Sequence, residues 1–325
     1  MNWLVTGGCG FIGSRVVERL VADGDEAVRV VDDLSVGRRA DLARVADFME
    51  IEAAASGMPE WSDGEVQFMA ADVRSPELTA AAQGAEIIVH LAAQSGVAPS
   101  VENPRADCEI NVLGTLNCLE AARTDTARRF IFASSGAAVG EVEPPIHEEI
   151  VPHPASPYGA SKASGEAYCE CYYRTFGLET VALRFSNVYG PGSALKNSIV
   201  ARFFRRALAG ETLEIYGDGG QTRDFIYVDD LVDAVCKAAR TPGLGGDRFQ
   251  VATNRETSVL QVTDLILNVL SEAGVEDITI RHTSPRQGDV RENYSDISRA
   301  RDLLGWSPDV GLEEGLRRTL AWFLD

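Results

Sequence analysis

The chain has 325 residues, of which 45% are hydrophobic and 24% charged, and its formal net charge at pH 7 is -19. This composition supplies enough apolar side chains for a sizeable core and excludes a disordered or collagen-like chain. The excess of acidic residues excludes a surface built for nucleic acid or anionic lipid. A polyanionic ligand must therefore be held locally, by a few arginines and backbone amides. The length predicts two domains, or one domain with a smaller appended lobe.

The beginning of the chain leads from Met1 directly into an apolar strand pattern, without a basic leader segment or cleavage site. No apolar stretch reaches the roughly 18 residues that a membrane-spanning helix needs. The six cysteines form no CxxC pair and have no histidine at ligand spacing. We therefore expect a cytoplasmic protein with reduced thiols that pack in the interior, with no membrane association and no metal site.

Short apolar, β-branched runs alternate with segments of helical period through the first half of the chain. The predicted strands cover residues 3–6, 28–31, 66–69, 87–91, 130–133 and 180–184. Strands that alternate with helices in this way form a parallel sheet through right-handed crossovers. We predict an α/β fold of the Rossmann type, which is a doubly wound parallel sheet with helices on both faces.

The rhythm is less regular in two places. Residues 49–64 contain Gly57, Pro59 and Gly64 without a clear period, which predicts an irregular excursion between the second and third strands. After Pro191, predicted helices at 198–209, 228–239 and 258–273 are separated by Gly and Pro clusters. We therefore predict a nucleotide-binding domain over residues 1–185 and a smaller C-terminal α/β lobe mainly over residues 186–325, with some chain returning to the first domain.

A glycine-rich loop follows the first strand directly and precedes an amphipathic helix. Gly7, Gly10 and Gly13 suit a tight turn, close approach of the backbone to a pyrophosphate, and close helix packing. The second strand ends at Asp32, a carboxylate that would accept hydrogen bonds from a ribose diol and repel a 2'-phosphate. These features predict NAD rather than NADP, although Arg38 and Arg39 weaken that choice. The alternative is a solvated turn at Asp32.

A tyrosine and a lysine share one face of a predicted helix after Pro157. Tyr158 and Lys162 are four residues apart, so the ammonium is expected to lower the pKa of the phenol and let it act as a base. Ser134 and Ser135 follow the predicted fifth strand, at the sheet edge where such folds place their chemistry. The alternatives are a surface pair on a helix and an ordinary loop.

The motifs taken together resemble the extended short-chain dehydrogenase/reductase family, and within it the nucleotide-sugar epimerases of the UDP-glucose 4-epimerase type. The resemblance covers essentially the whole chain. The matching segments, in addition to the glycine loop, the serines and the Tyr-Lys pair, are 72–73, 90–94, 111–115, 183–191, 217–224 and 286–289.

The resemblance implies a role for each of the following residues. Ser135, Tyr158 and Lys162 would be catalytic, and Lys162 would also hold the nicotinamide ribose. Residues expected at the cofactor are Gly7, Gly10, Phe11, Ile12, Gly13, Asp32, Asp72, Val73, Leu91, Ala92, Ala93 and Asn111. Residues expected at the sugar nucleotide are Asn187, Tyr216, Arg223, Arg286, Asp289 and Asn293. Each arginine taken alone could equally belong to a surface salt bridge.

The chain departs from the usual family motif after its catalytic serine. The motif normally reads Ser-Ser-x-x-Val-Tyr-Gly, whereas Val139 stands here in place of the tyrosine, which leaves the local packing open. Dehydratases and decarboxylases of the family carry an acidic residue two positions past this serine, and dehydratases carry another beside it. Gly136 and Ala137 offer no such group, so loss of water has no proton donor here. Reversible oxidation at C4 of the sugar is the most compatible reaction.

The implied activity is NAD-dependent C4 epimerisation of a UDP-sugar through a transient 4-keto intermediate, in a homodimer formed through helices at 107–123 and 157–176. A 4-ketoreductase or a UDP-glucuronate decarboxylase is the alternative enzyme. The intact Ser135, Tyr158 and Lys162 set argues against a non-catalytic NAD-binding protein.

The identity of the sugar is left open by the sequence. Asn293 stands where a large tyrosine would exclude a 2-acetamido group, so glucose, N-acetylated and uronate forms all remain candidates. Gly96, Val97, Leu195 and Lys196 are expected to border the sugar pocket without defining its contents.

Overall fold

The protein is described here by a computed structural model, covering residues 1–24, 26–52, 57–125, 127–285 and 291–325. The chain divides into two compact units. Unit 1 comprises Met1–Glu141, Ile150–Arg184 and Val232–Phe249. Unit 2 comprises Val142–Glu149, Phe185–Leu231 and Gln250–Asp325. Each unit has its own hydrophobic core, and the two are treated separately below.

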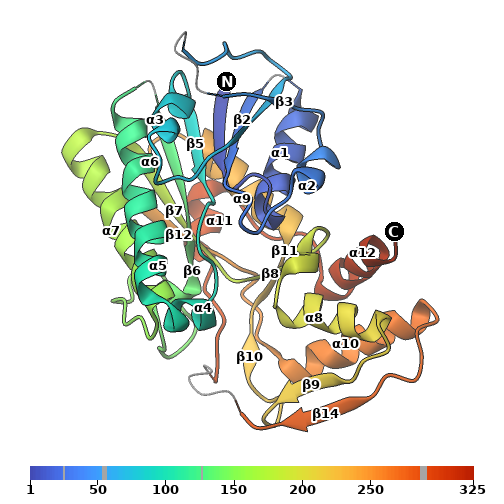
Figure 1. The fold of residues 1–325 in the computed structure, drawn as a ribbon. Helices are drawn as coiled ribbons and strands as arrows, with labels where there is room; N and C mark the ends of the chain where they lie inside the picture. Colours follow the sequence, from blue (N-terminus) through green and yellow to red (C-terminus); the bar gives the residue numbers. More distant parts are fainter. Residues whose placement is uncertain (25, 53–56, 126, 286–290) are drawn as a thin grey trace. The chain divides into compact units, whose positions relative to one another are not determined.

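An eight-stranded sheet forms the centre of unit 1, in the order β12-β7-β6-β5-β1-β2-β4-β3 (Figure 1). All neighbouring pairs from β6 to β3 are parallel, which confirms the predicted Rossmann-type fold. The strands are β1 (Asn2–Thr6), β2 (Ala27–Asp32), β3 (Met49–Glu50), β4 (Val66–Ala70), β5 (Ile87–His90), β6 (Arg129–Ser135), β7 (Glu179–Phe185) and β12 (Asp247–Val251).

The six predicted strands are all present, and two more join the sheet at its edges. β3 lies within the segment predicted to be an irregular excursion, and its two residues pair with β4. β12 lies in the part of the chain after Pro191, where no strand was predicted. Both additions are edge strands, whose position in a sheet depends on a partner far away in the sequence.

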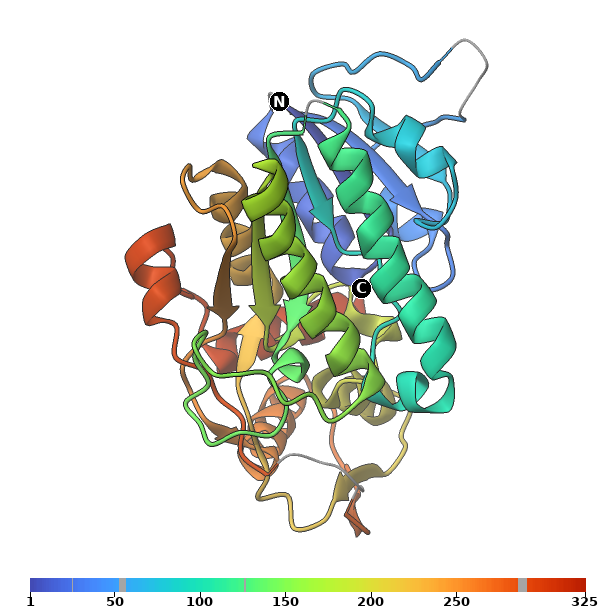
Figure 2. The same cartoon turned by 90° about the vertical axis from the view of Figure 1, so that its left-hand side faces the viewer.

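Helices cover both faces of this sheet (Figures 1 and 2). The helices are α1 (Phe11–Asp23), α2 (Arg39–Ala43), α3 (Glu77–Ala82), α4 (Val97–Glu102), α5 (Pro104–Cys108), the π-helix η1 (Glu109–Leu113), α6 (Gly114–Arg123), the 3-10 turn η2 (Gly136–Ala138), α7 (Pro157–Phe176) and α9 (Val228–Arg240). The predicted helix 107–123 is thus interrupted, because η1 separates α5 from α6.

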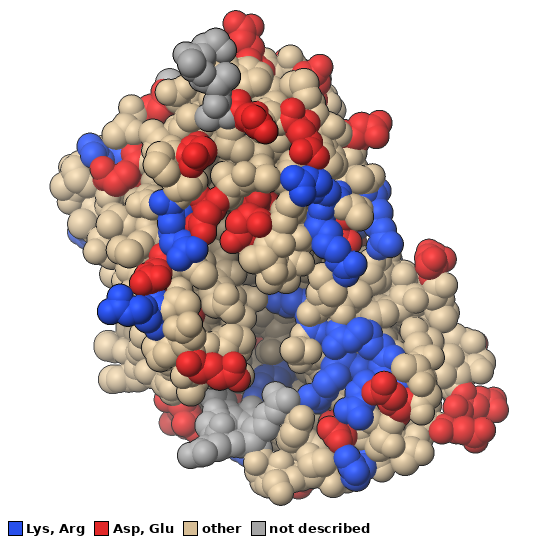
Figure 3. All heavy atoms as spheres, viewed as in Figure 1, with Lys and Arg blue, Asp and Glu red and all other residues tan. Residues whose placement is uncertain are grey.

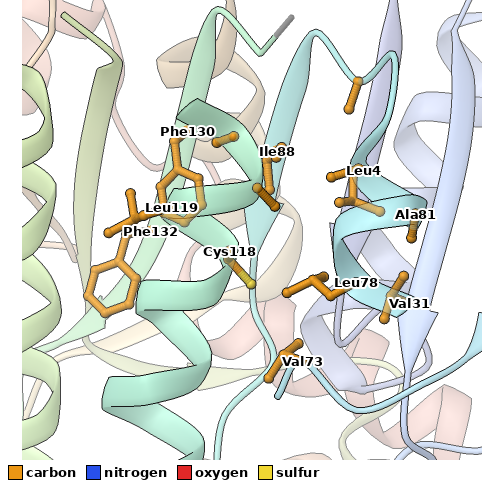
Figure 4. Close-up of a cluster of buried hydrophobic side chains, with 14 of the residues drawn as sticks. Leu4, Val31, Val73, Leu78, Ala81, Ile88, Cys118, Leu119, Phe130 and Phe132 are labelled. Atoms are coloured by element: carbon orange, nitrogen blue, oxygen red, sulfur yellow. The ribbon is translucent and has the colours of Figure 1, made fainter. Parts of the chain in front are cut away.

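The core on one face of the sheet is built from α3, α6 and α7 (Figure 4). Leu78 of α3 and Leu119 of α6 pack with the strand residues Leu4, Ile88 and Phe130. These side chains are almost fully buried. Burial of each one stabilises the fold by roughly 1.5–3 kcal/mol. Because these strands are parallel, the loops that follow β1, β2, β5 and β6 all leave the sheet at its carboxyl edge.

The helix α7 begins and ends at residues suited to those positions. The Ser156 hydroxyl accepts a hydrogen bond from Gly159 N at 3.1 Å, and Pro157 occupies the first turn, where a missing N–H costs nothing. Gly177 ends the helix with a positive φ of 73°. These caps fix the first turn, and with it the positions of Tyr158 and Lys162.

Unit 2 has a core of α8, α10 and α12 packed on small sheets, with Phe203, Tyr227, Ile266 and Leu316 among its buried residues. Its two-stranded sheets pair β8 with β11 and β9 with β14 in parallel, and β10 with β13 antiparallel. The elements are β8 (Asn187–Tyr189), the 3-10 turn η3 (Ser193–Leu195), α8 (Ile199–Leu208), β9 (Leu213–Tyr216), β10 (Thr222–Arg223), β11 (Phe225–Tyr227), β13 (Thr257–Ser258), α10 (Val259–Glu272), β14 (Ile280–Thr283), α11 (Ser298–Leu304) and α12 (Leu312–Leu324).

Among the described residues, none of the helices combines the length and the apolar character required to cross a lipid bilayer.

Candidate functional site

The glycine loop between β1 and α1 is packed so closely that side chains cannot be added. Gly7 has a φ of 73°, and a Cβ at this residue would lie 2.7 Å from the backbone N of Ala92. A Cβ at Gly13 would lie 2.1 Å from the carbonyl oxygen of Gly7. The backbone of the loop therefore packs directly against the first turn of α1, which contains Phe11 and Ile12.

The N-terminus of α1 has no side-chain cap. Gly10 precedes the helix without a capping hydrogen bond, and the first turn contains no acidic residue. The unpaired backbone N–H groups and the positive end of the helix dipole thus face the loop. This is the arrangement that binds a phosphate or pyrophosphate.

Asp32 lies at the end of β2 beside this loop and is 8% exposed. Its carboxylate accepts hydrogen bonds from Cys9 N at 2.9 Å and Leu34 N at 2.8 Å. Burial raises the pKa of Asp32, against the lowering effect of those two backbone donors. The two amides fix the carboxylate in one orientation at the carboxyl edge of the sheet.

The remaining residues predicted at the cofactor follow β4 and β5 or lie on η1. Val73 is buried, and the neighbouring Asp72 forms an ion pair with Arg74 at 2.5 Å. Leu91, Ala92 and Ala93 follow β5, where Ala92 N donates to Thr6 Oγ1 at 3.3 Å. Asn111 is 2% exposed and bonds both backbone groups of Gln94. Unit 1 thus carries all the predicted cofactor residues at the strand ends and helices of one sheet edge.

The predicted catalytic residues Ser135, Tyr158 and Lys162 come together in unit 1. Ser134 and Ser135 are the last residues of β6, not residues past it, and the Ser135 hydroxyl lies close enough to the Tyr158 phenol to lower its pKa. Lys162 Nζ donates to the Ala133 carbonyl at 2.8 Å and lies 5.8 Å from the centroid of the Tyr158 ring. β6 and α7 therefore place the two hydroxyls and the amine around one point.

The pKa of the phenol differs from the sequence-based expectation. Burial raises the pKa of Tyr158 to about 12, the bond from Ser135 opposes this rise, and Asp107 adds to it. The predicted lowering by Lys162 is wrong for these residues by themselves, because the amine donates to a backbone carbonyl instead of to the phenol. Burial also lowers the pKa of Lys162 to about 8, although Asp107, Cys169 and Glu166 raise it.

Val139 is fully buried in place of the tyrosine that the family motif carries. Its N–H donates to Gly136 O at 3.1 Å, and its carbonyl accepts from His153 N at 2.7 Å. The apolar side chain thus fills its position without an unpaired polar group, and the main chain around Ser135 keeps its hydrogen bonds.

Unit 2 contains a cavity of about 200 Å³ that collects three of the predicted substrate residues. Asn187, Tyr216 and Arg223 line it, together with Arg202, which the sequence analysis did not select. The guanidinium of Arg202 lies 5.1 Å from the centroid of the Tyr216 ring, within the range of a cation–π contact. Arg202 belongs to α8, over which Lys and Arg side chains gather in Figure 3.

The structure describes only one of the three other residues predicted at the sugar nucleotide. Arg286 and Asp289 lie outside the described residues. Asn293 is partly buried, and its N–H donates to Thr222 Oγ1 at 3.3 Å, beside Arg223 on β10. In unit 1, Gly96 and Val97 begin α4; in unit 2, Leu195 and Lys196 end η3, where burial lowers the pKa of Lys196.

Residues 3–252 match the profile of the NAD dependent epimerase/dehydratase family. The chain belongs to this family. It is 40% identical to a UDP-glucose 4-epimerase of Mycolicibacterium smegmatis over 99% of this chain and 98% of the relative.

Two crystal structures of related proteins have the same fold. A UDP-glucose 4-epimerase of Thermotoga maritima with UDP-glucose has a TM-score of 0.88 and 37% identity, covering 100% of this chain and 99% of the other. A UDP-glucuronic acid 4-epimerase of Bacillus cereus, in complex with UDP-glucuronic acid and NAD, has a TM-score of 0.86 and 28% identity, again covering 100% and 99%.

The cofactor of this family is NAD, and the residues present fit it. The glycine loop leaves a backbone surface that any Cβ would obstruct, and the uncapped start of α1 offers N–H donors to a pyrophosphate. Asp32, held by Cys9 and Leu34, offers acceptor oxygens to a ribose diol. Bound NAD supplies reversible hydride acceptance.

We expect the substitution Gly13→Ala to reduce NAD binding and stability together. The new methyl group would collide with the carbonyl of Gly7, so α1 must move away from the loop, at a cost of about 1–3 kcal/mol in unfolding free energy. Calorimetric titration with NAD and thermal unfolding measure the two effects. Gly311→Ala is the control, since a Cβ there meets open space. NAD affinity equal to that of the wild type would contradict the assignment.

Proposed function

We propose that the chain is an NAD-dependent epimerase that inverts C4 of a UDP-sugar through a transient 4-keto intermediate. The observation that carries this proposal is the hydroxyl pair of Ser135 and Tyr158 one helical turn from Lys162, followed by Gly136 and Ala137. The pair suits proton transfer at one carbinol, whereas elimination or decarboxylation would use an acidic residue beyond the serine.

Each catalytic residue has a separate role in this proposal. Tyr158 accepts the proton of the sugar 4-hydroxyl and returns it after inversion. Ser135, which lies beside the phenol, donates a hydrogen bond to the same sugar oxygen. Lys162 Nζ lies 5.8 Å from the centroid of the ring, and its ammonium is proposed to favour the phenolate only once cofactor and substrate are bound. Because burial raises the pKa of Tyr158 to about 12, the phenol holds its proton tightly until this positive charge and a bound substrate oppose that effect.

The cavity of unit 2 is proposed to bind the nucleotide end of the substrate. Tyr216 offers a flat face to the base, and Asn187 and Arg223 offer donors to the diphosphate. Arg286, Asp289 and Asn293 are proposed to complete this group. In a chain of net charge -19, arginines collected at one cavity provide the local positive charge that a diphosphate requires.

The direct test incubates the purified protein with UDP-glucose, UDP-galactose, UDP-N-acetylglucosamine and UDP-glucuronate without added NAD. We expect the C4 epimer of at least one of them in the proton NMR spectrum, because the cofactor is regenerated in every turnover. Release of NADH would instead indicate a 4-ketoreductase, and release of carbon dioxide a decarboxylase. No conversion of any of these sugars would contradict the proposed function.

We expect Arg223→Met to raise KM for the UDP-sugar about 10- to 100-fold while kcat changes little. The guanidinium would lose its charge-assisted bonds to the diphosphate, which contribute about 1.5–3 kcal/mol and act equally before and during the reaction. Initial-rate kinetics and the affinity for UDP measure this effect. Arg301→Met is the control, because Arg301 is exposed and paired with Asp302. A lower kcat with an unchanged KM would contradict the assignment.

We also propose that the protein acts in the cytoplasm as a homodimer. All six cysteines are free thiols, as is typical of a reducing compartment. Leu113 on η1 and Tyr173 and Phe176 on α7 are between 40% and 50% exposed, so the two predicted pairing segments present apolar surface. Light scattering should give twice the chain mass of 35.0 kDa. A mass equal to one chain would exclude this dimer.

A further inference from the structure

A fully buried carboxylate lies next to the predicted catalytic residues of unit 1, and among the described residues no cation forms an ion pair with it. Asp107 is 0% exposed. Its carboxylate accepts hydrogen bonds from Asn111 Nδ2 at 2.9 Å and from the hydroxyl of Ser161. Both of these donors are neutral, and burying a charge is costly unless an opposite charge lies nearby.

Lys162 is the nearby cation, and it follows Ser161 directly on α7. Its side chain is 4% exposed, lies 5.0 Å from the centroid of the Phe132 ring and donates to the Ala133 carbonyl. The ring and the carbonyl stabilise the ammonium, but neither carries a formal negative charge. Lys162 is therefore a buried amine whose protonation depends on the carboxylates around it.

The ionisable groups that face Lys162 come from three elements. Glu166, Cys169 and Tyr158 lie on α7 with it, His90 lies on β5, and Asp107 lies on α5. Burial lowers the pKa of His90 to about 3, so this ring is neutral, and burial raises the pKa of the Cys169 thiol, so this group is neutral as well. Asp107 and Glu166 are thus the carboxylates in this environment.

Glu166 already has a strong cationic partner. Arg184, which is 0% exposed, donates to it from Nε at 2.8 Å and from Nη2 at 2.7 Å, and Ser134 donates to the same carboxylate. The charge of Glu166 is therefore largely balanced by Arg184. Asp107 is therefore the carboxylate that chiefly stabilises the ammonium of Lys162.

The π-helical turn η1 positions Asn111 to contact Asp107. η1 inserts a π-helical turn between α5 and α6, a feature often found at functional sites. Asn111 lies on this turn, and its amide bonds Asp107 on one side and Gln94 on the other. One carboxylate is thus bonded both to a predicted cofactor residue and to the residue preceding the catalytic lysine.

We propose that Asp107 is a positioning residue of the reaction, which keeps Lys162 in its ammonium form and fixes the Asn111 amide. This inference rests on the proposed function for its effect on catalysis, but its effect on Lys162 can be measured independently. Asp107 acts through Lys162 and Asn111 and needs no contact with substrate or cofactor.

The test is the substitution Asp107→Asn. Removal of the carboxylate charge lowers the pKa of Lys162, so the ammonium is lost at a lower pH and the alkaline limb of the kcat profile moves down. For a shift of one pH unit we expect about a fivefold loss of kcat near pH 8, rising to about tenfold at higher pH. Asp107→Glu retains the charge and should recover most of the activity. Glu109→Gln is the control, because the side chain of Glu109 is 41% exposed and pairs with Arg105.

The protonation of Lys162 can be followed directly by NMR of protein labelled at lysine, since Lys162, Lys196 and Lys237 are the only lysines of the chain. We expect the midpoint of the Lys162 signal to fall in Asp107→Asn and to stay unchanged in Glu109→Gln. If Asp107→Asn does not fold, Asp107→Ser carries the same prediction. An unchanged Lys162 midpoint in the folded variant would overturn the proposal. A wild type without epimerase activity would overturn the proposed function alone.

Discussion

Replacement of Tyr158 by phenylalanine is expected to reduce kcat by about 10²–10⁴-fold, because it removes the group proposed to accept and return the proton of the sugar hydroxyl. The ring would remain in place on the first turn of α7, beside Ser135 and Lys162. The affinities for NAD and for UDP should therefore stay close to those of the wild type. Steady-state kinetics and calorimetric titration separate these two effects.

Tyr173→Phe is the matched control for this prediction. Tyr173 lies on the same helix, is 40% exposed, and contacts Gly245 and Gly246 through its ring, which phenylalanine retains. It should turn over substrate like the wild type. Turnover by Tyr158→Phe within about tenfold of the wild type would show that another group serves as the base.

The substitution Glu166→Ala is expected to lower the free energy of unfolding by about 3–5 kcal/mol. It removes the carboxylate that two nitrogens of Arg184 and the hydroxyl of Ser134 contact, and it leaves the guanidinium of Arg184 buried without its counter-charge. Urea unfolding followed by circular dichroism measures the loss. This would be one of the largest effects of a single substitution, since most cost less than about 3 kcal/mol.

Glu170→Ala provides the comparison one helical turn later. Glu170 pairs with Arg174 and Arg248, each at 2.8 Å, but all three side chains have at least 31% of their surface exposed. Such pairs contribute about 0–1 kcal/mol because water screens them. Equal losses in Glu166→Ala and Glu170→Ala would mean that the buried pair contributes no more than a surface pair.

The sequence could predict those features of the fold that depend on neighbouring residues. The six main strands, the helix that begins at Pro157 and the glycine loop before α1 all follow from local patterns of apolar residues, glycines and caps. The parallel order of the sheet follows from the same alternation. The edge strands β3 and β12 could not be predicted in this way, because a two-residue or isolated strand is defined by its distant partner.

The candidate site shows the same division. Tyr158 and Lys162 could be paired from their spacing on one helix, and Ser135 from its place after a strand. Asp107 and Glu166 gave no such signal: each is an ordinary acidic residue of a helical segment until α5, β7 and α7 pack together and exclude water. Arg202 lines the cavity because α8 packs beside β9, and local sequence patterns do not encode this packing.

By itself, then, the sequence determined the fold class, the choice of NAD and the residues that suit proton transfer, because each depends on residue type and short spacing. Only the tertiary structure decided which charges are buried together, and through this the pKa values of Tyr158 and Lys162. The physical reason is that desolvation and the energy between charges depend on the three-dimensional surroundings of a group, which local periodicity does not encode.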